Sequence, residues 1–298
     1  MSPHDLMVQA ITLAHPTLAL PVQATTATVF SSDAPVYRAA KQACLALGFI
    51  EIDAECLAKA WQAMTTRTGQ FNAAAWPDQA EDFGLRPWPR DEAFAACPQK
   101  MGLYAVLPDA AWIGRMARAG VPTVQLRFKS DDTGAIEREI RAAVQAVQGT
   151  KALLFINDHW QAAIAAGAYG VHLGQEDMDS ADLQAIRTAG LRLGLSSHGY
   201  AEMVVADSFS PSYIALGAVF PTTLKRMVTA PQGTGRLSAY ARLMRDYPLV
   251  AIGGIDSSKL PEVLASGVGS VAVVRALVAA DNPEAMAASL QAAINAKA

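Results

Sequence analysis

The stretch that decides the fold is residues 155–177, FINDHWQAAIAAGAYGVHLGQED. Its apolar ends predict two short strands, and the alanine-rich middle predicts a helix between them. Each strand runs into a carboxylate, Asp158 after the first and Asp177 after the second. Carboxylates at two neighbouring strand ends suit Mg²⁺, although Asp158 also suits a cap on the following helix and Asp177 the start of a turn before the next one. The choice between a metal site and these local structural roles depends on the rest of the sequence.

Strands and helices alternate from Met101 to the C-terminus. Strands are expected at 102–107, 123–128, 152–156, 170–173, 192–196, 213–215, 249–252 and 270–274. Helices are expected at 110–119, 134–147, 160–166, 180–189, 200–208, 235–246, 259–266 and 283–296. This alternation over about 200 residues predicts an α/β fold, a parallel (β/α)8 TIM barrel, at residues 98–298. An open doubly wound sheet is less favoured, because Leu107-Pro108-Asp109 stands where its glycine-rich loop would follow the first strand.

Residues 1–97 do not show this alternation of strands and helices. Their first third is rich in Thr, Ala and Pro, helices are expected at 36–47 and 54–64, and residues 76–89 read as a linker or extended arm. No catalytic constellation occurs there. We predict a small, mostly helical N-terminal extension that packs against the barrel.

Composition excludes several classes of function. The 298 residues are 52% hydrophobic, which allows a large core, and the net charge of −3 indicates neither nucleic acid nor an anionic membrane as partner. The three cysteines lack metal-ligand spacing and read as reduced structural thiols. No signal peptide or membrane span is apparent, so a cytoplasmic protein is expected. Its partners are expected to be small molecules, and homo-oligomer formation is left open.

Unusual polar residues follow the early strands, where barrel enzymes place their chemistry. Gln125, Arg127 and Lys129 alternate within the second expected strand and should face the barrel axis. Burying unpaired cations costs several kcal/mol, so either an anion or an internal layer of ion pairs should match them. Asn157 ends the third strand and Ser196 the fifth.

The late strands predict a second anion site. A polar loop containing Thr222, Thr223, Leu224 and Lys225 follows the sixth strand and suits a lid. Gly253-Gly254 follows the seventh strand and Val274-Arg275 the eighth, where barrels often bind phosphate. The first site, with its cations and a metal on Asp158 and Asp177, suits a diphosphate, and the second suits a monophosphate. The chemistry that fits is displacement of diphosphate by a phosphate-bearing second substrate.

Seven motifs in these regions resemble those of the thiamine phosphate synthase family, and they occur in the family's order. They are VQLRFK at 124–129, FIND at 155–158, GVHLGQED at 170–177, GLSSH at 194–198, VFPT at 219–222, APQG at 230–233 and VAIGGI at 250–255. The resemblance covers the chain from Met101 almost to its end.

The resemblance implies condensation of 4-amino-2-methyl-5-hydroxymethylpyrimidine diphosphate with a thiazole phosphate, or its carboxylated form, to give thiamine phosphate and diphosphate. Diphosphate would leave first, and the thiazole nitrogen would capture the pyrimidine cation. Asp158 and Asp177 would carry Mg²⁺. Arg127, Ser196 and Lys225 would be catalytic, and the pyrimidine diphosphate would also contact Gln125, Lys129 and Asn157. Thr222, Gly254 and the Val274 region would hold the thiazole phosphate. His172 would either contact the pyrimidine ring or be a buried core histidine.

Three departures from the family pattern are expected to flank the thiazole phosphate site. Leu224, with Thr223 beside it, stands where a threonine is usual, Arg275 replaces a serine, and Thr234-Gly235-Arg236 replaces a commoner Leu-Glu. Arg275 would either bind the phosphate or point outward. In the extension, residues 39–66 faintly resemble the C-terminal part of a hydroxymethylpyrimidine phosphate kinase. A non-catalytic remnant of that kinase is therefore one interpretation of the extension, beside simple packing.

Other functions remain open at this level. A thiazole tautomerase shares the fold, with His198 placed for proton transfer, but it would not need the diphosphate-binding set. Another phosphate-binding barrel, such as an isomerase or aldolase, is a second alternative, although neither Lys225 nor Lys151 is placed for a Schiff-base aldolase. A barrel that binds thiamine precursors without turnover is the third.

Overall fold

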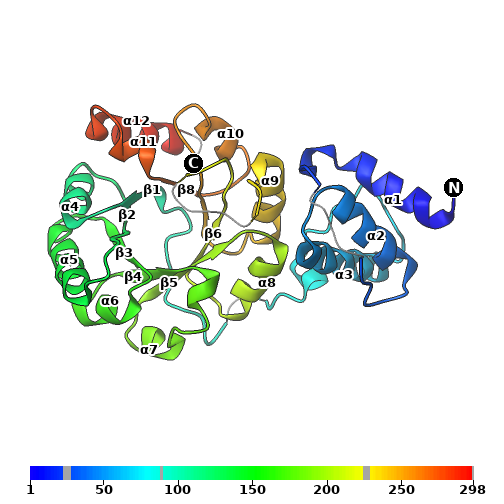
Figure 1. Cartoon of the computed structure of the whole chain (residues 1–298), viewed down its shortest axis with the longest axis horizontal. Coiled ribbons are helices and arrows are strands. Elements are labelled where there is room, and N and C mark those ends of the chain that lie inside the picture. Colours follow the sequence, from blue (N-terminus) through cyan, green and yellow to red (C-terminus); the bar gives the residue numbers. More distant parts are fainter. Residues whose placement is uncertain (23–27, 88–89, 224–228, 297–298) are drawn as a thin grey trace.

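The computed structural model describes residues 1–22, 28–87, 90–223 and 229–296. Eight parallel strands close into a barrel in chain order, which confirms the (β/α)8 prediction (Figure 1). The strands are β1 (Gly102–Leu107), β2 (Thr123–Leu126), β3 (Leu153–Asn157), β4 (Gly170–Leu173), β5 (Arg192–Ser197), β6 (Tyr213–Leu216), β7 (Leu249–Ala251) and β8 (Ser270–Val273). Because β8 pairs with β1, the open-sheet alternative is wrong.

Helices surround the barrel (Figure 1). They are α4 (Ala110–Arg118), α5 (Thr133–Ala146), α6 (Trp160–Ala166), α7 (Leu183–Thr188), α8 (Tyr200–Ser208), α9 (Gly233–Leu243), α10 (Leu260–Leu264) and α12 (Pro283–Asn295). Side chains of Asp109, Asp132, Asp182 and Asn282 cap α4, α5, α7 and α12, accepting hydrogen bonds from first-turn N–H groups. Two short helices were not expected: η3 (Gln175–Asp177) after β4 and α11 (Arg275–Val278) after β8.

Large aromatic side chains fill the barrel interior. Tyr104, Phe155 and Tyr213 pack together there, each at most 1% exposed. Two glycines on adjacent strands make room for them. Gly170 pairs with Phe155 and Gly194 with Tyr213, and a Cβ at either glycine would overlap the facing ring. The interior is therefore filled by packed side chains and is not an open channel.

The N-terminal segment packs beside α8 and α9 (Figure 1). It contains α1 (Pro3–Ala14), η1 (Pro16–Leu18), α2 (Pro35–Ala46), α3 (Glu51–Thr68) and η2 (Ala80–Phe83). Helix α1 was missed because its apolar residues lack a sustained period, although Ser2 and Asp5 form a capping box at its start. Buried residues of this segment join the same apolar core as the barrel helices. That residues 1–97 form a kinase remnant stays a prediction.

The three cysteines form no disulfide. Burial raises the pKa of the Cys56 and Cys97 thiols to about 12 and that of Cys44 further, which disfavours the reactive thiolate. Within the described ranges, no helix is both long and apolar enough to cross a membrane.

Candidate active site

Asp158 and Asp177 lie at the mouth of the barrel, after the adjacent strands β3 and β4. Asp158 adopts a left-handed backbone with φ 65°, and its N–H donates to the His172 carbonyl at 3.0 Å. It does not cap α6, whose N-cap is His159 without a side-chain bond. The Asp177 side chain accepts from the Gly174 N–H at 2.8 Å, and its carbonyl accepts from the Ser180 and Ala181 N–H groups. The expected turn at Asp177 is therefore present, whereas the expected helix cap by Asp158 is wrong.

Electrostatics at this pair favour a cation. Partial burial raises the pKa of Asp177, and the neighbouring Asp158 and Glu176 carboxylates raise it further, against the Gly174 hydrogen bond. Lys129 Nζ lies 3.3 Å from Asp158 Oδ2, and its side chain is 62% exposed. Two carboxylates supply the hard oxygen donors that Mg²⁺ prefers, and Mg²⁺ usually completes its octahedron with water and phosphate. Among the described residues, no group of three or more His, Cys, Asp or Glu side chains is placed to hold a metal ion.

The structure corrects one geometric prediction about the cations. β2 ends at Leu126, so only Gln125 faces the interior, and Arg127 and Lys129 lie in the loop beyond it. An internal ion-pair layer on this strand is therefore wrong. The Arg127 backbone is fixed by a 2.8 Å bond from its N–H to the Leu107 carbonyl. Its guanidinium is half-buried and pairs with no described residue, so it remains available to an anion.

Six side chains form a continuous chain of hydrogen bonds across the barrel interior, from β3 to β5. In order they are Asn157, Gln125, Tyr104, Tyr213, His172 and Ser196. The five successive distances are 2.8, 2.8, 2.7, 2.7 and 2.9 Å. The chain thus joins two of the predicted substrate-binding residues, Asn157 and Ser196, through the core.

Donor and acceptor requirements give this chain one direction. Gln125 Nε2 donates to Asn157 Oδ1, so Gln125 Oε1 accepts from the Tyr104 hydroxyl. Tyr104 must then accept from Tyr213, because burial raises the pKa of both phenols and keeps them protonated.

The direction continues to the other end of the chain. Tyr213 accepts from His172 Nδ1–H, which leaves Nε2 to accept from the Ser196 hydroxyl. Ser196 therefore offers lone pairs to the mouth, and Asn157 offers its amide N–H groups.

Sequence reasoning missed Tyr104 and Tyr213. The sequence did carry a signal for them, because each is a tyrosine in an otherwise apolar strand. Their side chains point into the barrel, as those of Gln125 and His172 do. His172 is 7% exposed, and both ring nitrogens bond within the barrel, as expected for a buried core histidine. His198 lies outside this chain and pairs with Glu202 on α8, with Nδ1 and Oε2 2.6 Å apart.

The loops after β7 and β8 lie side by side, because these strands pair. Gly254 has φ 66°, and a Cβ there would overlap the Pro221 carbonyl, so the loop packs directly under residues 220–221. Val274 precedes α11, and Arg275 is exposed without a described partner. Thr222 is half-buried and Thr223 exposed, whereas Leu224 and Lys225 lie outside the described residues.

The third departure from the family pattern does not flank this site. Gly235 and Arg236 lie in α9 and face the N-terminal segment: a Cβ at Gly235 would overlap the Thr17 carbonyl, and Arg236 donates to the Leu18 and Leu47 carbonyls at 2.9 Å. The expectation that these residues flank the phosphate site is therefore wrong, because they contact the N-terminal segment instead.

Comparisons with known proteins agree on one family. A family model described as thiamine monophosphate synthase matches residues 103–277. The thiamine-phosphate synthase of Neisseria meningitidis serogroup B is 55% identical over 199 residues, covering 67% of this chain and 97% of that protein. The Yersinia pestis protein of the same name is 51% identical over 197 residues, covering 66% and 92%. A solved thiamine phosphate pyrophosphorylase from Pyrococcus furiosus matches with a TM-score of 0.60 and 28% identity, covering 67% and 98%.

Proposed function

Because the chain belongs to the thiamine monophosphate synthase family, we infer that the mouth of its barrel joins the pyrimidine diphosphate to the thiazole phosphate. The protein is an enzyme of thiamine biosynthesis, a transferase that forms thiamine phosphate and releases diphosphate. The observation that carries the site assignment is the pair of carboxylates, Asp158 and Asp177, at adjacent strand ends beside Lys129.

The diphosphate end of the substrate is proposed to lie between the carboxylate pair and the cations. Asp158 and Asp177 would hold Mg²⁺, which neutralises charge on the diphosphate oxygens when it is bound. Arg127 and Lys129 donate to those oxygens and stabilise the charge that develops as diphosphate departs. Lys225 is proposed to act with them from the loop after β6.

The pyrimidine ring is proposed to contact Ser196 and Asn157. An aminopyrimidine carries both N–H donors and ring-nitrogen acceptors, and the buried hydrogen-bond chain leaves Ser196 as an acceptor and Asn157 as a donor. Gln125 and His172 would then orient these two groups from below. Fixed polarity at both positions favours one orientation of the ring, with its reactive carbon toward the second substrate.

The thiazole phosphate is proposed to bind at the loops after β6, β7 and β8. Backbone N–H groups at Gly254 and at the start of α11 would receive the phosphate, with Thr222 and Thr223 beside it. Val274 would line the pocket, and Leu224 and Arg275 are proposed to modify it. The thiazole nitrogen is then placed to capture the pyrimidine cation.

Purified full-length protein with Mg²⁺ and both precursors is expected to release thiamine phosphate and diphosphate in equal amounts. Chromatography of thiamine phosphate and an enzymatic assay for diphosphate measure the two products, and omission of either precursor is the control. Binding of thiazole phosphate without product would instead indicate a tautomerase or a non-catalytic binding barrel.

Tyr213→Phe is expected to lower kcat/KM for the pyrimidine diphosphate about tenfold, because it removes the central hydroxyl of the buried chain without changing its volume. Nitrogen-15 NMR should show His172 protonated at Nδ1 in the wild type and mixed tautomers in the variant. Tyr169→Phe is the matched control, since Tyr169 contacts the same aromatic cluster but lies outside the chain. Equal tautomer mixtures in wild type and Tyr213→Phe would contradict the assigned direction.

A further inference from the structure

We propose that residues 1–97 clamp α8 at both ends and that Asp53 is a positioning residue for the β5–α8 turn. That turn, residues 198–199, carries His198 and directly follows the end of β5, where Ser196 lies. The inference rests on the proposed role of Ser196 in binding the pyrimidine diphosphate, and it assigns the extension a part in that binding.

The N-terminus of α8 is capped by a residue of the extension instead of by the residue that directly precedes the helix. A helix leaves its first N–H groups without partners, and a Ser, Thr, Asp or Asn at the N-cap usually accepts from one of them. Here the N-cap is Gly199, which has no side chain, and Asp53 Oδ1 accepts from the Ala201 N–H at 2.8 Å, 148 residues away in sequence. A Cβ at Gly199 would overlap the Asp53 carboxylate. A capping side chain can therefore come from position 53 or from position 199, but the space does not allow both.

Asp53 is otherwise poorly placed for a charged group. It is 4% exposed, and burial raises its pKa to about 6, while hydrogen bonds from the Ala201 and Tyr200 N–H groups act in the opposite direction. A buried carboxylate is expensive unless it is hydrogen-bonded, and a helix N-terminus stabilises negative charge. The contact with α8 thus accounts for an acidic residue at this buried position.

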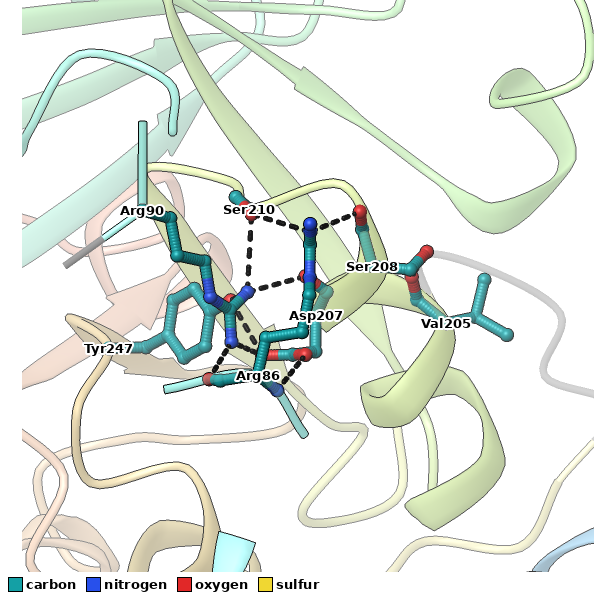
Figure 2. Close-up of polar contacts among 7 residues, drawn as sticks. All are labelled: Arg86, Arg90, Val205, Asp207, Ser208, Ser210 and Tyr247. Atoms are coloured by element: carbon teal, nitrogen blue, oxygen red, sulfur yellow. Dashed lines mark hydrogen bonds and ion pairs between the residues drawn. The ribbon is translucent and has the colours of Figure 1, made fainter. Parts of the chain in front are cut away.

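The C-terminus of α8 is held by Arg86 and Arg90, which lie in the last part of the extension (Figure 2). Arg86 Nη2 donates to the Ser208 carbonyl at 2.7 Å, and Arg90 Nη1 donates to the Asp207 carbonyl at 2.7 Å. Arg90 also forms a buried ion pair with the Asp207 side chain at 2.5 Å. Cations that bind the last carbonyls of a helix complement its dipole. Residues 1–97 therefore satisfy both ends of the same helix.

Aromatic packing holds the first residue of α8 in place. Trp76 Nε1 donates to the Tyr200 hydroxyl at 2.8 Å, and the Phe83 ring stacks on Tyr200 with centroids 5.4 Å apart. On the neighbouring α9, the buried Arg236 guanidinium lies 3.6 Å from the centroid of the Phe49 ring while it donates to extension carbonyls. The extension is thus packed against α8 and α9 through specific, buried contacts.

Short contacts transmit the position of α8 to the mouth. Ser197 Oγ donates to the Gly199 carbonyl at 3.1 Å, and the His198 N–H donates to Glu202 Oε2, on the first turn of α8, at 2.8 Å. Ser196 immediately precedes these residues and must stay within reach of His172 Nε2. Loss of the Asp53 cap would free the start of α8 and loosen the turn that follows Ser196 at the end of β5.

In the full-length enzyme, Asp53→Ala is expected to raise KM for the pyrimidine diphosphate about tenfold while KM for the thiazole phosphate stays within about twofold. Asp82→Ala is the matched control. Asp82 is also a buried extension carboxylate, but its side chain accepts from Arg67 within the extension. It should lose thermal stability and leave both KM values unchanged.

A second variant tests whether the cap itself is responsible. Gly199 has φ −177° and ψ −173°, which any residue adopts, so Gly199→Asp in the Asp53→Ala background supplies a local N-cap. The double variant should recover KM to within about threefold of wild type, whereas Gly199→Asp alone should be impaired by overlap with Asp53. If Asp53→Ala does not fold, Arg90→Met at the other end of α8 should raise the same KM about threefold.

The outcomes separate two kinds of failure. Wild-type protein that forms no thiamine phosphate contradicts the proposed function. Wild-type turnover with Asp53→Ala indistinguishable from Asp82→Ala, no rescue by Gly199→Asp, or an unchanged KM in Arg90→Met overturns the positioning role alone.

Discussion

Asp177→Asn is expected to lower kcat by about a thousandfold or more, because it removes one of two carboxylates proposed to hold the cation that neutralises the leaving diphosphate. The amide oxygen of Asn still accepts from the Gly174 N–H, so the turn after β4 is kept. Asp177→Ala should lose the same activity and also destabilise the turn. Comparison of the two variants separates the effect of the lost negative charge from that of the lost hydrogen bond to the Gly174 N–H.

The control for this prediction is Asp179→Asn, which removes an exposed carboxylate two residues away and should leave kcat unchanged. Isothermal titration of Mg²⁺ with a diphosphate should show binding in wild type and Asp179→Asn and none in Asp177→Asn. Full turnover by Asp177→Asn would show that the metal assignment is wrong.

The raised pKa of Asp177 gives this prediction a pH dependence. In the metal-free protein the folded state holds the proton more tightly than the unfolded chain, so stability falls as pH rises through the raised pKa. Mg²⁺ binds the ionised form and opposes this loss. The increase in Tm caused by Mg²⁺ should therefore be larger at neutral than at mildly acidic pH, and Asp177→Asn should abolish the difference.

Arg127→Met is expected to lower kcat/KM for the pyrimidine diphosphate by about a hundredfold to a thousandfold, since Arg127 is a half-buried cation without a described partner at the mouth. Arg127→Lys should restore only part of the activity, because an ammonium cannot match two phosphate oxygens as a guanidinium does. KM for the thiazole phosphate should change little in either variant.

Arg138→Met provides the comparison for a lost positive charge, since Arg138 is an exposed residue of α5 that lies 3.6 Å from Asp132. Steady-state kinetics with each substrate varied in turn make the measurement. Equal losses for both substrates, or a loss equal to that of Arg138→Met, would contradict a specific role for Arg127 at the diphosphate.

Several features of the enzyme could be predicted from sequence because their causes are local. Short apolar strands alternating with amphipathic helices specify the barrel, and a polar residue at the start of the loop that follows a strand must lie at the C-terminal mouth. Asp158 and Asp177 were located in this way. The end of β2 was placed two residues too late, because Phe128 continues the apolar alternation although the chain has already left the sheet.

Tertiary structure alone decided which groups meet across the molecule. The hydrogen-bond chain from Asn157 to Ser196 draws on six strands, and its direction depends on the donor and acceptor needs of every member. Asp53 and Ala201 are 148 residues apart, and neither shows a local sign of the other. The Gly235-Arg236 pair reads as a departure in sequence, but together with the glycine at the N-cap of α8 it leaves space and supplies hydrogen bonds for a segment that folds against both helices. Such contacts arise from packing between distant elements, so periodicity and spacing carry no record of them.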